Sequence, residues 1–329
     1  MNQESLRPGL KTWSALSGNR KRPSEYEVLT YKLHTRTVNP DAPYEQDTGT
    51  AMNRWYKKYV VGSPLVHDDW DAFRDPDQVT YRAYTTMQDG QEQFVDGLLD
   101  IHSESRHDAS LSAEWVDVLA KLYTPGRYLV GAGQMVSAYL VQTAPASTIT
   151  NCAAFQEADQ LRWVSRTAYR TRELANTYPD AGFASAERFH FESSPEWQGF
   201  RELVEKSMVT YDWAECFFVW NVITARAIDE AWLHQLGAAA RRHDDGLTGM
   251  LADNQMKDSE RSRRWTAALM ALALTVPENR AVLAGWEKKW VPLAEKAIDD
   301  FCAALPDSPQ AGKAAKDACA AFRREIGLD

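Results

Sequence analysis

The apolar residues of this chain recur at helical spacing over most of its length, and this pattern predicts a series of long helices. The Asp75-Pro76 pair supplies an N-cap and a proline at the first helical position, which favours a helix from there to about residue 105. Further helices are expected over 112–143 with a break at Thr124-Pro125-Gly126, 144–178, from 195 onward, 213–242, 246–276, 278–305 and 312–326. No alternating strand pattern competes with them, so we predict an all-α fold, a mainly antiparallel helical bundle.

The first 68 residues differ from the rest because no helical or strand period persists in them. They contain five prolines and seven aromatic residues, a richer aromatic content than disordered segments have. We therefore divide the chain into a long extended N-terminal arm over 1–68 and a helical domain over 69–329. Aromatic side chains should fasten this arm to a surface of its own chain or of a partner. The residues expected at such an interface are Trp13, Tyr26, Trp55 and Tyr56.

The composition narrows the possible functions. The 329 residues have 44% hydrophobic content and 12 tryptophans, which is enough for a large core with extensive helix packing. The formal net charge of −9 argues against a general nucleic-acid-binding protein. The N-terminus is polar and no stretch of 18 apolar residues occurs, so we expect neither a signal peptide nor a membrane span. Four scattered cysteines without a Cys-x-x-Cys pair fit reduced thiols in a cytoplasmic protein.

Two Glu-x-x-His sequences could supply metal ligands, because a spacing of three places both side chains on one face of a helix. The first is Glu104/His107, at the polar end of a predicted helix, and the second is Glu187/His190, in a loop bounded by prolines. A di-iron pair lies between apolar helix faces, and neither sequence has that context. A self-contained metal-binding helical enzyme built on these four residues is the alternative function.

Two other runs have the interior context but lack the ligands. In them Gln160 and Ser262 stand where a Glu-x-x-His motif has its glutamate, and Trp163 and Trp265 stand where it has its histidine. An amide or a hydroxyl is a poor substitute for a carboxylate, and an indole offers no lone pair to a metal. The runs indicate either a di-iron bundle that has lost its metal or two ordinary amphipathic helices. Motifs this short do not separate these readings.

Longer segments of the sequence favour the first interpretation, a di-iron bundle that has lost its metal, because they resemble a known family. The chain resembles the β subunit of the hydroxylase component of bacterial multicomponent (soluble di-iron) monooxygenases from about residue 11 to about residue 305. It is most similar to the toluene/o-xylene monooxygenases, with isoprene and alkene monooxygenases nearby. The segments that carry the resemblance are Lys11–Trp13, Arg22–Glu27, Asp68–Gln78, Met87–Glu92, Ala144–Cys152, Thr167–Leu174 and Tyr178–Gly182.

The resemblance implies a ferritin-like helical fold and a non-catalytic, structural role in a complex that inserts one oxygen atom of O₂ into a small aromatic or alkene hydrocarbon. In that family the catalytic α subunit holds the di-iron centre, so no cofactor is expected in this chain. The expected partners are α and a small γ subunit in an (αβγ)₂ hydroxylase, with an effector protein, a Rieske ferredoxin and an NADH-dependent reductase as transient partners. The arm would wrap α, and the hydrocarbon itself is not identified by this chain.

Overall fold

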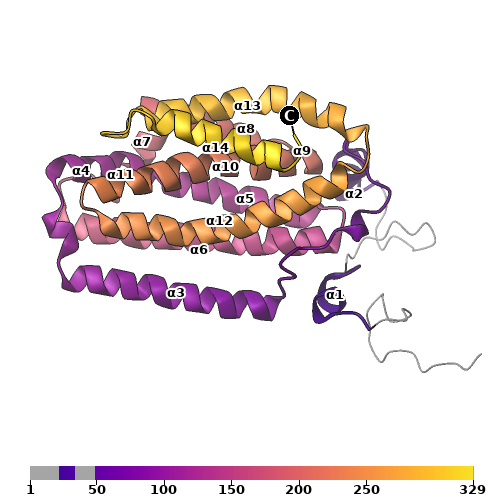
Figure 1. The fold of residues 1–329 in the computed structure, drawn as a ribbon, viewed down its shortest axis with the longest axis horizontal. Coiled ribbons are helices and arrows are strands. Elements are labelled where there is room, and N and C mark those ends of the chain that lie inside the picture. The colour runs from indigo at the N-terminus through magenta and orange to yellow at the C-terminus, as the bar shows by residue number, and fades with distance from the viewer. Residues whose placement is uncertain (1–21, 34–48, 329) are drawn as a thin grey trace, which may run out of the picture.

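The computed structural model describes residues 22–33 and 49–328, and in these ranges the body of the molecule is helical (Figure 1). Four helical runs form its centre, and two short links make neighbouring runs antiparallel. The runs are α5 (Arg127–Thr143), α6 (Ser147–Thr177), the sequence of α9 (Trp213–Phe217), η6 (Phe218–Thr224), α10 (Ala225–Ile228), η7 (Asp229–Gln235) and α11 (Leu236–Arg242), and α12 (Gly246–Ala273). The predicted all-α bundle is confirmed.

The outer helices cover the central bundle from two sides. At one edge of Figure 1, α3 (Tyr81–Glu104) lies along α6 and α12, and at the opposite edge lie α8 (Pro195–Met208), α13 (Asn279–Cys302) and α14 (Ala311–Glu325). Shorter segments complete the fold: α1 (Glu25–Thr30), α2 (Ala51–Tyr56), η1 (Lys57–Val61), η2 (Trp70–Ala72), η3 (His107–Ser110), α4 (Ala113–Val118), η4 (Leu119–Tyr123), η5 (Thr124–Gly126) and α7 (Glu187–Ser193). Among the described residues, no helix has the length and apolar character needed to cross a membrane.

Several helix boundaries follow the local signals in the sequence. The Ser112 side chain accepts a hydrogen bond from the backbone N–H of Trp115, which starts α4 as predicted. The break expected at Pro125 is confirmed, because a π-helical and a 3₁₀ segment separate α4 from α5 there. Asp212 caps α9 by accepting from the backbone N–H groups of Ala214 and Glu215.

The predicted start of the first long helix at Asp75 is wrong, because α3 begins at Tyr81 with Thr80 as its N-cap. The carboxylate of Asp75 is buried and accepts from the backbone N–H groups of Asp77 and Val79, each at 3.0 Å. This arrangement closes a turn rather than a helix, and Gln78 completes it with a positive φ of 48°. The Asp-Pro signal therefore marks a turn five residues before the helix.

The described part of the predicted arm contains α1, α2 and η1, joined by stretches without regular structure. Ser24 and Glu27 form a capping box that starts α1, with hydrogen bonds of 2.9 and 3.2 Å. Val60 and Leu65 belong to the main hydrophobic core. The end of this segment is therefore continuous with the helical domain.

Close packing of aromatic rings fixes how the central helices approach one another. Trp115, Trp197, Trp213, Trp220, Trp232 and Trp290 are fully buried. Gly126 lies directly against Trp232, where an added Cβ would come within 2.0 Å of the indole ring. Gly133 on α5 lies in the same way against Trp220. The abundance of tryptophan thus serves the core, with glycine where a ring meets a backbone.

Candidate functional site

A cluster of neutral polar side chains lies at the centre of the four-helix bundle. Ser137 of α5, Gln156 of α6, Asn221 of η6 and Thr266 of α12 each contribute one side chain, and none is more than 4% exposed. Gln156 donates to Ser137 Oγ at 3.1 Å, and Asn221 Nδ2 donates to Gln156 Oε1 at 2.9 Å and to Thr266 Oγ1 at 3.1 Å. We call these four residues the interior polar cluster.

The interior polar cluster joins four helices through a chain of hydrogen bonds from Ser137 through Gln156 and Asn221 to Thr266. Its members are two amides and two hydroxyls, so the cluster carries no charge to balance an iron pair, which binds carboxylates and imidazoles. Within the described part of the chain, no three His, Cys, Asp or Glu side chains converge as a metal site requires. The donor set present at the centre of the bundle therefore does not fit a di-iron group.

Gln160 and Ser262 lie one helical turn away from this cluster. Gln160 is half-buried and faces α5, where its Oε1 would lie 2.9 Å from a Cβ added to Gly133. The Ser262 hydroxyl accepts from Arg226 Nη2 at 2.7 Å and donates to the backbone carbonyl of Ser259 at 2.9 Å. Both positions are in the bundle, but their side chains make separate contacts.

Trp163 and Trp265 are both buried, and they fill different places. The Trp163 indole N–H donates to Asp258 Oδ2 at 2.8 Å, on the side of α6 that faces α3 and α12. Trp265 packs against Phe217 with the ring centroids 5.3 Å apart. The four positions singled out in the sequence are thus interior, as expected, but they do not gather at one point. Their descent from metal ligands stays a prediction.

Sequence reasoning missed Ser137, Asn221 and Thr266, the cluster members on α5, η6 and α12. Asn221 left a signal, because it is a single amide within the apolar run Phe217–Ile223. Such a residue in a buried helix needs a hydrogen-bonding partner and therefore points to an interior polar contact. Ser137 left no comparable signal, since small hydroxyl residues are common in helices.

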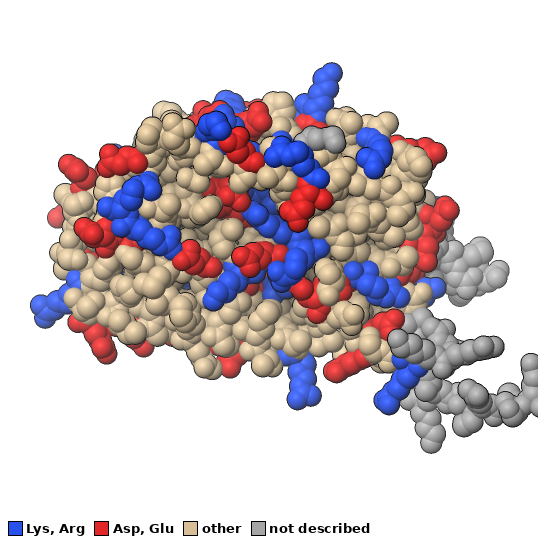
Figure 2. Space-filling model, in the orientation of Figure 1, with Lys and Arg blue, Asp and Glu red and all other residues tan. Residues whose placement is uncertain are grey.

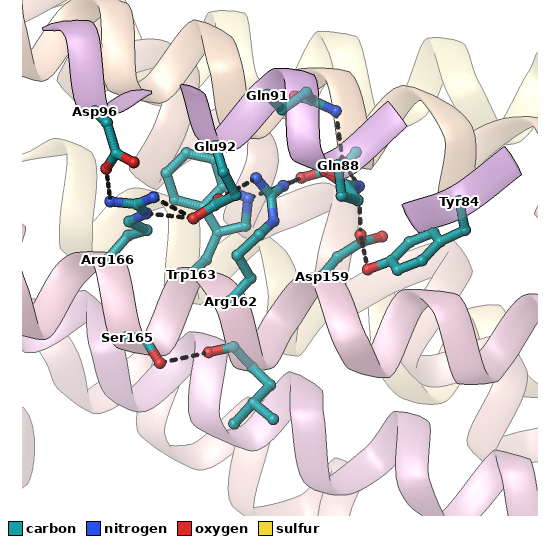
Figure 3. A network of polar contacts seen from close by, with 12 residues as sticks. Tyr84, Gln88, Gln91, Glu92, Asp96, Asp159, Arg162, Trp163, Ser165 and Arg166 are labelled. Carbon is teal, nitrogen blue, oxygen red and sulfur yellow. Dashed lines mark hydrogen bonds and ion pairs between the residues drawn. The ribbon is translucent and has the colours of Figure 1, made fainter. Parts of the chain in front are cut away.

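A second polar network fastens α3 to α6 and α12 (Figure 3). Gln88 of α3 donates to Asp159 at 2.9 Å and to Asp258 at 2.8 Å, so its amide bridges two buried carboxylates. Arg261 pairs with Asp159, and Arg162 pairs with Asp258. Each carboxylate therefore has an arginine partner, as buried charges require.

Further contacts extend this network along the helix. Tyr84 donates from its hydroxyl to Asp159 at 2.9 Å, and Arg162 pairs with Glu92 at 2.8 Å. Arg166 contacts Glu92 as well and pairs with Asp96 at 2.5 Å. The contacts follow α3 over several turns, so charge pairing rather than apolar burial alone holds this helix on the bundle.

Burial and the nearby charge of Asp258 raise the pKa of Asp159 to about 7, against the opposing attraction of Arg261. Burial also tends to lower the pKa of Arg261, but the two facing carboxylates outweigh it and the net shift is upward. These directions agree physically, because one guanidinium faces two carboxylates that repel each other. Arg261 therefore stays charged, and the pKa of Asp159 stays above its usual value.

The Glu104/His107 pair is not assembled as a metal site. Glu104 is exposed at the last residue of α3, whereas His107 lies in η3 beyond a left-handed residue, Arg106 with φ of 54°. His107 Nε2 is 3.1 Å from Asp245 Oδ1, and Trp115 donates to the other oxygen of Asp245 at 2.8 Å. The imidazole thus links η3 to the N-cap of α12.

The Glu187/His190 pair lies in α7, which the sequence analysis placed in a loop. Glu187 is buried, its Oε1 accepts from the backbone N–H of Ala184, and its Oε2 lies 4.0 Å from Arg127. His190 Nδ1 is 3.2 Å from Ser194 Oγ. Both side chains have local structural partners, so the geometry does not favour the alternative enzyme.

The predicted interface residues contact their own chain. Tyr26 is 3% exposed, and its hydroxyl accepts from the backbone N–H of Asp75 at 3.0 Å. Trp55 donates to the hydroxyl of Tyr139 at 2.9 Å, and Tyr56 packs against the main core. These contacts hold the segment on the helical domain of its own chain. Trp13 lies outside the described residues. Contact of these residues with a partner stays a prediction.

The chain is similar in sequence to subunits of known hydroxylase components. The β subunit of the hydroxylase component of the toluene-4-monooxygenase system from Ectopseudomonas mendocina is 48% identical over 305 residues, covering 93% of each chain. The small subunit of the hydroxylase component of propane 2-monooxygenase from Gordonia sp. (strain TY-5) is 23% identical, covering 83% of this chain and 77% of that protein.

Solved structures and a family model place the chain in the same group. A structure of toluene 4-monooxygenase with toluene bound in its resting active site matches with a TM-score of 0.87 and 47% identity, over 92% of this chain and 99% of that one. Phenol hydroxylase from Pseudomonas sp. OX1 shares the fold, with a TM-score of 0.82 at 20% identity over 94% and 92%. Residues 55–277 match the model of the methane/phenol/alkene hydroxylases. The chain belongs to the methane/phenol/alkene hydroxylase family.

Proposed function

We propose that this chain is the non-catalytic β-type subunit of a di-iron hydroxylase that inserts one oxygen atom of O₂ into a small aromatic or alkene hydrocarbon. One observation carries the non-catalytic assignment: the four helices meet on the neutral interior polar cluster, which lacks the charge and the ligands for iron. The likeness to the β subunit of the toluene-4-monooxygenase system over 93% of the chain supports the assembly.

The chain works in this proposal as a rigid frame for a catalytic α subunit that holds the di-iron centre. A small γ subunit completes an (αβγ)₂ hydroxylase, and an effector protein, a Rieske ferredoxin and a reductase act on it in the cytoplasm. Two structural features support a frame role. The interior polar cluster fixes four helices, and the charged network along α3 fixes a fifth.

The test compares the lone chain with the co-expressed hydroxylase. Each is reconstituted with Fe(II) under anaerobic conditions, and iron per chain and hydrocarbon oxidation are measured. We expect iron and turnover with the co-expressed catalytic subunit and no stoichiometric iron in the lone chain. Two tightly bound irons per lone chain, or full turnover by the catalytic subunit without this chain, would refute the proposal.

A further inference from the structure

An apolar stripe with a seven-residue repeat runs along the exposed side of α3. Its large residues are Met87, Phe94 and Ile101, which are 38%, 49% and 64% exposed. Between them lie the small residues Ala83, Gly90 and Gly97. We call these six residues the α3 stripe. Its spacings alternate between three and four, which is the pattern of a helix surface that meets another helix.

Neither glycine of the α3 stripe is required by packing or backbone conformation in the described part of its own chain. Among the described residues, no atom lies within 4 Å of a Cβ added to either of them, and neither has a positive φ that favours glycine. Glycine in a helix interior costs about 1 kcal/mol relative to alanine. Two such costs fall on one face of a 24-residue helix, and a contact outside the chain would offset them.

Close approach of a second helix is a cause that fits both glycines. Because glycine has no side chain, the surface is depressed between Met87, Phe94 and Ile101. Side chains of a neighbouring helix fill such depressions when the two helix axes are about 8 Å apart. The stripe from Ala83 to Ile101 is about 27 Å long, the length of a full helix contact. In Figure 2 uncharged side chains make up much of the lower edge of the visible face, where α3 runs, with charged ones scattered between them.

We infer that a helix of the larger, catalytic hydroxylase subunit lies along the α3 stripe, with large apolar side chains seated at Gly90 and Gly97. This inference rests on the proposed function. The relatives are named as β or small subunits of hydroxylase components. We therefore take the permanent partner of such a chain to be a different and larger subunit. The charged network holds an adjacent side of α3 on its own bundle, and along the edge of the stripe Arg261 contacts Met87 and Lys257 lies over the Phe94 ring. Large parts of Met87, Phe94 and Ile101 stay exposed to a neighbour.

The test replaces both glycines by leucine in the full chain co-expressed with the catalytic subunit. Gly90→Leu/Gly97→Leu should raise or preserve the melting temperature of the lone chain, because leucine favours helix and the space is open. The catalytic subunit recovered with it should fall at least tenfold. The matched control, Asp89→Leu/Ser103→Leu, adds leucine at two exposed positions outside the stripe and should leave recovery unchanged.

Each outcome bears on one claim. Undiminished recovery with the double glycine variant would overturn the inference, whereas failure of the unaltered chain to recover any catalytic subunit would refute the proposed function instead.

A second measurement identifies the neighbour. Gln93→Cys, beside the stripe, is labelled with maleimide-benzophenone in a chain whose four native cysteines are buried. We expect a cross-link to the catalytic subunit, and a product of two copies of this chain, or none, would contradict it.

Discussion

Replacing Asn221 by leucine tests whether the interior polar cluster holds the bundle together. The change keeps the number and branching of the side-chain heavy atoms, so it removes hydrogen bonds without opening a cavity. Two donated hydrogen bonds are lost, to Gln156 Oε1 and to Thr266 Oγ1. Both acceptors are buried and no solvent replaces the donor.

The magnitude follows from those contacts. A typical internal hydrogen bond contributes about 0.5–1.5 kcal/mol, and a buried group left without a partner costs about 1–3 kcal/mol. We therefore expect Asn221→Leu to lower the free energy of unfolding by about 2–4 kcal/mol. In the double variant Gln156→Leu/Asn221→Leu the two main partners disappear together, so its loss should be at least 1 kcal/mol smaller than the sum of the single losses.

The assay is thermal unfolding of the co-purified hydroxylase, followed by calorimetry, with iron content measured in parallel. The single variant Asn221→Leu should lower the melting temperature of this chain by roughly 5–10 °C, on the scale of about 2–4 °C per kcal/mol. Iron per complex should not change. A melting temperature within 1 °C of the unaltered protein, or losses that add fully in the double variant, would refute this account of the cluster.

Three further predictions concern other parts of the chain. The folded pKa of Asp159, about 7, lies above its unfolded value, so its contribution is complete below about pH 4 and is lost as pH rises toward 7. The stability of the unaltered chain relative to Asp159→Asn should therefore fall by about 2–4 kcal/mol between pH 4 and pH 8 in urea titrations. His107→Ala and His190→Ala should leave hydrocarbon turnover within twofold of normal, whereas loss of turnover in an intact complex would revive the alternative enzyme. Gly126→Ala should destabilise by about 1–3 kcal/mol in thermal melts, because its Cβ meets the Trp232 ring.

The sequence predicted the helices well where a local signal starts or breaks them. Ser112 and Pro125 act through nearby backbone groups, so their effects are visible in the sequence. Asp75 carries a similar signal, but Tyr26 accepts from its backbone N–H and its own carboxylate closes a turn. That use depends on a contact 49 residues away, which no local pattern contains.

Gln160 and Ser262, the positions named from the sequence, lie one helical turn from the interior polar cluster. Gln160 and Gln156 share a face of α6, and the choice between them depends on which side chains the other helices present. The π-helical segment η6 makes that choice harder, because it changes the phase of the helix at Asn221. A pattern based on 3.6 residues per turn cannot follow such a shift.

The fold places its polar side chains where they fix helices and its apolar stripe where a neighbour can reach it. The interior polar cluster demands a specific alignment of four helices, because each amide must meet its partners. The network around Asp159 and Asp258 then sets the rotation of α3, since Gln88 reaches both carboxylates in one orientation. That rotation leaves Gly90 exposed and Phe94 about half-exposed, with Lys257 of α12 over its ring. A bundle with neutral polar side chains at its centre is thus held in a fixed arrangement, and α3 can serve as the rigid surface that we infer for it.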